Sequence, residues 1–218
     1  SVSDSRFEVV GGQLKLKDGV SLDHEGEPSV SVTVTSTDAS GASVSEAFNI
    51  TVSNVNEGPT DIGLSNSTIS ENAAGAVVGT LSTTDPDAGD THSYSVSDNR
   101  FEVVGGQLKL KDGVSLDHEG EPSVSVTVTS TDASGASVSE AFNITVANVN
   151  EGPTDIGLSN ATISENAAGA VVGTLSTVDP DAGDTHTYSV SDDRFEVVGG
   201  QLKLKDGVSL DHEGEPSV

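Results

Sequence analysis

Oxygen-bearing side chains gather at five turn-like positions of a sequence unit that recurs along the chain. In its complete copy these positions are SEN, DPDAGD, LDHE, TDASG and NVNEGP, and their acidic and amide residues are Glu71, Asp85, Asp87, Asp117, Glu119, Asp132, Asn148, Asn150 and Glu151. Calcium takes roughly six to eight oxygen ligands from carboxylates, carbonyls and water, whereas magnesium usually keeps several waters and few carboxylates. The residue types therefore favour calcium as the bound ion.

Softer metals and redox chemistry are excluded by what the chain lacks. Cys, Met and Trp are absent, so there are no disulfides and no thiolate ligands. The five histidines are copies of two positions, His92/His186 and His24/His118/His212. These are too few in any one unit to form a zinc or copper cluster.

The charge of the chain argues against two classes of partner. Asp and Glu number 35 against nine Lys and Arg, a formal charge of -26, which repels nucleic acid and anionic lipid. We expect no nucleic-acid partner and no direct membrane contact. Without an initiator Met or an apolar run near the roughly 18 residues of a membrane span, the chain is expected to be an internal segment of a longer protein.

The recurring unit is 94 residues long, as the spacing of Phe7, Phe101 and Phe195 shows. A fixed period of this kind predicts an array of similar modules. The stretch NVNEGPT, at 54–60 and again at 148–154, has the Asn, Gly and Pro content of a linker. We therefore predict the C-terminal part of a repeat at 1–57, a complete repeat at 58–151 and the N-terminal part of another at 152–218.

Alternation of apolar and polar residues predicts strands throughout the repeat. Val124, Val126 and Val128 alternate with Ser and Thr, and a similar run ends at Val146. Gly105 and Gly106 lie between two such runs and predict a tight hairpin turn. About seven short strands in 94 residues predict an all-β fold of tandem seven-stranded antiparallel Greek-key sandwiches of immunoglobulin-like type, arranged as a rod.

The five acidic motifs, taken together and in this order, resemble the calcium motifs of the cadherin repeat. The resemblance covers the whole chain, and near-identical acidic repeats of this kind look like those of large bacterial surface adhesins. Two departures stand out: His118 replaces the usual Arg of the LDRE-like loop, and the linker NVNEGP is one residue shorter than the animal pattern. The resemblance implies calcium bound at each junction, with three ions in the family pattern.

Carried over residue by residue, the resemblance assigns ligands to two junctions. The first would use Asp23, Glu25, Asn54, Asn56, Glu57, Asp85, Asp87 and Asp132, and the second Glu71, Asp117, Glu119, Asn148, Asn150, Glu151, Asp179 and Asp181. Two carboxylates about 4 Å apart repel by roughly 4 kcal/mol at an effective dielectric near 20, so such a junction needs cations. Individually, these residues also suit ordinary turns, and Glu71 suits an exposed surface position.

We expect an extracellular or cell-surface stalk that calcium stiffens, as part of a bacterial adhesin or a biofilm matrix, with neighbouring repeats as its partners. One alternative is that the partner is an identical chain, either in a filament in which chains complete one another's sandwiches or through a homophilic contact. Another is a calcium-dependent module that binds surface glycans, although an aromatic content of 3% leaves few faces for sugar stacking. An enzyme is not expected, because no nucleophile elbow, zinc-binding helix motif or phosphate loop is found.

Overall fold

Every helix or strand that the computed structural model shows in residues 1–214, the part of the chain it describes, is a β-strand. None of these residues forms a helix able to span a lipid bilayer. The chain divides into two compact units, the first comprising Ser1–Ile69, Ala73–Ser115 and Ser123–Thr145, and the second Ser70–Asn72, Leu116–Pro122 and the chain from Val146 onward. Each predicted linker lies inside one unit, and the repeat boundaries remain predictions from sequence.

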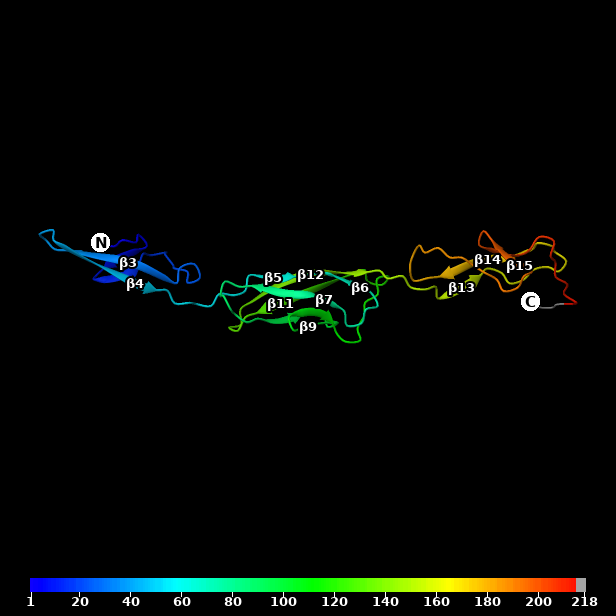
Figure 1. The fold of residues 1–218 in the computed structure, drawn as a ribbon, viewed down its shortest axis with the longest axis horizontal. Coiled ribbons are helices and arrows are strands. Elements are labelled where there is room, and N and C mark those ends of the chain that lie inside the picture. The colour runs from blue at the N-terminus through cyan, green and yellow to red at the C-terminus, as the bar shows by residue number, and fades with distance from the viewer. Residues whose placement is uncertain (215–218) are drawn as a thin grey trace. The chain divides into compact units, whose positions relative to one another are not determined.

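The complete repeat contains two four-stranded sheets (Figure 1). The first has the order β5-β7-β10-β9, with β5 Asp61–Leu64, β7 Val77–Thr84, β10 Gln107–Leu110 and β9 Phe101–Val104. The second has the order β6-β12-β11-β8, with β6 Thr68–Ser70, β12 Ser137–Ala147, β11 Ser123–Thr131 and β8 Ser93–Val96. The predicted all-β sandwich is confirmed.

Alternation places the apolar side chains of both sheets in one core. Val124, Val126 and Val128 on β11 are buried, as are Leu108 and Leu110 on β10. The intervening Ser and Thr side chains are more exposed, because successive residues of a strand point to opposite faces. The predicted hairpin joins β9 to β10 through two glycines with φ of 58° and 77°, the left-handed region that a two-residue turn of this type requires.

A hydroxyl network links the two sheets within this core. The Thr83 hydroxyl of β7 lies 2.8 Å from the Tyr94 hydroxyl of β8 and 2.7 Å from the Ser130 hydroxyl of β11. Ser130 is fully buried, so these hydrogen bonds satisfy a polar group that water does not reach. The network lies near the end of the sandwich from which the DPDAGD loop emerges.

Each flanking copy forms, separately, the part of a similar sandwich that its residues correspond to. Residues 1–57 contain two hairpins, β1 Phe7–Val10 with β2 Gln13–Leu16 and β3 Ser29–Thr37 with β4 Ser43–Thr51. From residue 152 onward, one four-stranded sheet has the order β13-β14-β16-β15, with β13 Asp155–Leu158, β14 Val171–Val178, β16 Gln201–Leu204 and β15 Phe195–Val198. Phe48 on β4 is 47% exposed, because residues 1–57 contain no counterparts of β5, β6 and β7.

Candidate metal centre

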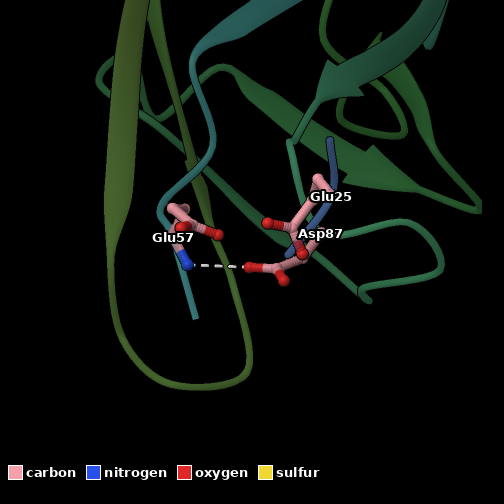
Figure 2. Close-up of side chains that lie close together, drawn as sticks. All are labelled: Glu25, Glu57 and Asp87. Atoms are coloured by element: carbon pink, nitrogen blue, oxygen red, sulfur yellow. Dashed lines mark hydrogen bonds between the residues drawn. The ribbon is translucent and has the colours of Figure 1, made fainter. Parts of the chain in front are cut away.

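Three carboxylates converge in the first unit (Figure 2). Glu25 comes from the loop between β2 and β3, Glu57 from the linker between β4 and β5, and Asp87 from the DPDAGD loop between β7 and β8. One oxygen of each lies within 4.8 Å of the others. The main-chain N–H of Glu57 also donates to Asp87 Oδ2 at 2.7 Å, which fixes the linker against the loop. These residues all belong to the predicted first junction.

The protonation of this cluster reflects its crowding. Desolvation, the Asp23 carboxyl and the charges of Glu57 and Asp87 raise the pKa of Glu25 above its usual range. The pKa of Asp87 is lowered instead, first by the side-chain amide of Asn54 and then by the N–H of Glu57. In this cluster the surroundings favour the charged form of Asp87 and disfavour the charged form of Glu25.

The linker asparagines present their nitrogens to the carboxylates. Asn54 Nδ2 donates to Asp87 Oδ1 at 2.8 Å, and Asn56 Nδ2 donates to Asp132 Oδ2 at 2.9 Å. The side-chain amide of Asn56, together with hydrogen-bond donors of the TDASG turn, lowers the pKa of Asp132 to about 2. An asparagine ligates a cation through Oδ1, so either residue would coordinate only after its amide turned by half a revolution.

The second unit holds a related group, in which the buried Glu71 joins the counterparts of Glu25 and Glu57. Oxygens of Glu71, Glu119 and Glu151 lie within 4.8 Å of one another. Glu71 is 2% exposed, so the alternative of an ordinary surface residue is wrong. Its Oε2 accepts the main-chain N–H of His118 at 2.8 Å and its Oε1 that of Val149 at 2.7 Å. These two bonds lower the pKa of Glu71, whereas desolvation and the charges of Glu71 and Glu151 raise that of Glu119.

One oxygen in this cluster has no partner. Glu151 Oε1 accepts a hydrogen bond from Asn72 Nδ2 at 2.6 Å, but Glu151 Oε2 is buried and unbonded, alone among buried side-chain polar atoms of residues 1–214. A buried carboxylate oxygen without a partner is costly. A hard cation would satisfy it, and the surrounding donors are carboxylate oxygens. The residues present therefore fit a calcium ion.

The DPDAGD loops hold further carboxylate groups that sequence reasoning identified in part. Asp85 and Asp87 lie together with Asp90, and Asp179 and Asp181 with Asp184. Asp90 and Asp184 were not predicted. A third group, Glu165, Asp211 and Glu213, was also not predicted, although each residue stands 94 positions after a predicted one.

Other predicted ligands have local roles in the structure. Asp23 and Asp117 each accept the main-chain N–H of the glutamate two residues later, at 3.1 Å, as turn-capping aspartates do. Asn150 Nδ2 donates to the carbonyl of Glu151 at 2.6 Å. Neither aspartate belongs to a carboxylate group found in the described residues. His118, which replaces the usual Arg, is half-buried, and its Nδ1 lies 2.6 Å from the carbonyl of Val146.

Solved structures of cadherin extracellular domains resemble this chain closely in fold. The structure of protocadherin gamma B7 domains 1–4 matches with a TM-score of 0.70 at 21% identity, covering 98% of this chain and 59% of that one. The chain has the cadherin-repeat fold. Mouse protocadherin-24 EC1-3 gives a TM-score of 0.68 at 21% identity over 98% of this chain and 77% of that one. Mouse cadherin-23 EC22-24 gives 0.64 at 20% identity over 91% and 70%.

These similarities concern the fold. The chain spans 58% of a second protocadherin gamma B7 structure, which is described as a cis-dimer of EC3-6, and 46% of protocadherin gamma B2 domains 1–5. It therefore spans about half the length of the first cadherin structures that it matches. No sequence-family model matches the chain.

Proposed function

We propose that the chain is a calcium-stiffened spacer of an extracellular array of cadherin-like repeats. The observation that carries the proposal is the convergence of Glu25, Glu57 and Asp87 from a loop of one repeat, a linker and a loop of the next. A cation bound there contacts all three segments at once. Binding energy would then offset the conformational entropy of the linker, about 1–2 kcal/mol for each residue that becomes fixed.

The chemistry of the cluster supports calcium over other divalent ions. Its donors are oxygens from several carboxylates, and Glu151 Oε2 of the second cluster lacks a hydrogen-bond partner. Extracellular calcium modules have dissociation constants on the order of 0.1–1 mM. Such sites fill at the millimolar calcium found outside cells and stay empty in the cytosol. The proposed location is therefore the cell surface or the extracellular space.

In this proposal the repeat is structural and not enzymatic, and the near-identity of its copies suits a spacer. Each repeat contacts chiefly its neighbours, so reach increases with copy number. The near-identical acidic repeats resemble those of large bacterial surface adhesins, so we propose that the chain is part of such an adhesin or of a biofilm matrix. The proposed ligands are the sixteen residues assigned to the two junctions, with the converging carboxylates as their centre.

Calcium titration of the chain tests this proposal. Calorimetry is expected to show binding with a dissociation constant on the order of 0.1–1 mM, and small-angle scattering is expected to show a larger maximum dimension with calcium than with chelator. The variant Asp87→Asn/Glu119→Gln is expected to lose most of the response. Glu140→Gln, an exposed residue of β12, is the matched control and should respond like the unmodified chain. Absence of binding at 10-fold the expected dissociation constant would refute the proposal.

The two alternatives remain predictions with separate tests. A filament of chains that complete one another predicts particles larger than a monomer in sedimentation at high protein concentration. A glycan-binding module predicts calcium-dependent retention on a glycan array. The spacer is supported if the chain is monomeric, is not retained on the glycan array and has a larger maximum dimension with calcium than with chelator.

A further inference from the structure

The side chain of His92, which is not an assigned ligand, contacts the assigned ligand Asp85. His92 Nε2 lies 2.8 Å from Asp85 Oδ2, and the side chains are only 12% and 4% exposed. The second DPDAGD loop repeats the contact, with His186 Nε2 2.7 Å from Asp179 Oδ2 and exposures of 22% and 6%. An ionised carboxylate can accept hydrogen bonds but cannot donate them. The ring nitrogen that faces it must therefore carry a proton and donate.

The other carboxylate oxygen of Asp85 is held by a main-chain hydrogen bond. Asp85 Oδ1 accepts the main-chain N–H of Asp87 at 3.0 Å, and Asp179 Oδ1 accepts that of Asp181 at 3.1 Å. Among the described residues one hydrogen-bond donor is found for each oxygen, which leaves a lone pair on each oxygen for a cation. With both oxygens held in this way, the carboxylate cannot rotate freely, and the two free lone pairs are presented in a fixed direction.

We propose that His92 and His186 are positioning residues that aim Asp85 and Asp179 at the bound cation. This inference rests on the proposed calcium function and adds to it the residue that orders the DPDAGD loop. Partners that hold metal ligands from behind typically change metal affinity about 10- to 100-fold when removed. The histidine acts through its hydrogen bond, so a neutral side chain with a donor at the same reach should replace it.

The test compares three variants of the full chain with the original. In His92→Ala/His186→Ala the calcium dissociation constant should rise about 10-fold or more. In His92→Gln/His186→Gln the amide can donate to the aspartate, and affinity should return to within a factor of about 3 of the original. Ser93→Ala, an exposed neighbour of His92, should leave affinity unchanged. Denaturation in chelator checks that the sandwich of each variant remains folded.

Terbium luminescence supplies a readout that loss of packing alone would not change. The decay in water and in heavy water reports the waters coordinated to bound terbium. The alanine variant should gain coordinated water where the aspartate has turned away, and the glutamine variant should not. Equal affinity and equal decay in all forms would overturn the role of the histidines while leaving the spacer intact. The role would also be overturned if the alanine variant unfolds while the glutamine variant stays folded but binds calcium weakly. If the unmodified chain binds no calcium, the proposed function itself fails.

Discussion

The main-chain N–H of Val149 donates to Glu71 Oε1, so an acidic residue near the start of the repeat holds the linker that ends it. The other oxygen of Glu71 holds the LDHE loop through the N–H of His118. One buried carboxylate therefore joins two segments that also supply Glu119 and Glu151 to the metal cluster. These hydrogen bonds fix the positions of the two segments that carry Glu119 and Glu151.

Glu71→Gln should destabilise the chain at neutral pH, because an amide offers one acceptor where the carboxylate offers two. The pKa of Glu71 is lowered in the fold, so its stabilisation is present above the ordinary value of 4.5 and is lost as pH falls through the lowered value. Urea denaturation in chelator should therefore show a deficit near pH 7 that shrinks near pH 3. Glu165→Gln is the control, since Glu165 is exposed and its counterpart bond is 3.4 Å long. A deficit independent of pH would contradict this role.

Asn54→Asp should have opposite effects with and without calcium. The amide of Asn54 donates to Asp87 Oδ1, and a carboxylate in its place would repel Asp87. Without calcium, limited proteolysis should cut the linker at 54–60 faster than in the unmodified chain. With calcium, the added charge should tighten binding several-fold in calorimetry. Slower proteolysis without calcium would show that the amide contact does not hold the linker.

Tyr94→Phe should lower the free energy of unfolding by about 1 kcal/mol, the usual net value of a hydrogen bond. The change removes the hydroxyl that lies 2.8 Å from Thr83 and leaves the aromatic ring in place. Chemical denaturation in chelator measures the loss. Ser123→Ala, at the exposed start of β11, should be neutral. An equal loss in both variants would mean that the hydroxyl network contributes nothing specific.

Gly106→Ala should cost about 1–2 kcal/mol, because a side chain disfavours left-handed backbone. The φ of Gly106 is 77° and an added Cβ would meet nothing within 4 Å, so the cost comes from the backbone alone. Gly152→Ala is the matched control, with equally open space and no left-handed φ. Chemical denaturation should separate the two. A neutral Gly106→Ala would show that the turn can adopt another geometry.

Local patterns predicted much of the fold, and less of the site. Alternating valines and the pair Gly105–Gly106 specify strands and a turn through interactions between near neighbours in sequence. The site depends on distant loops. Nothing local distinguishes Asp117, which caps its own turn, from Glu119, which reaches Glu71. Likewise, the bond between His92 and Asp85 depends on how the DPDAGD loop closes, which its composition leaves open.

Each carboxylate group combines positions of the 94-residue unit that keep the same residue wherever a copy includes them, and the six differences between copies fall outside these positions. An unequal exchange between two copies of the gene segment, made in register, therefore leaves every surviving group with its full set of oxygens. Descendant proteins could therefore gain or lose whole repeats while keeping the same carboxylates at each junction. The length of the array is thus a property that evolution can adjust in fixed steps, while the chemistry at each joint stays unchanged.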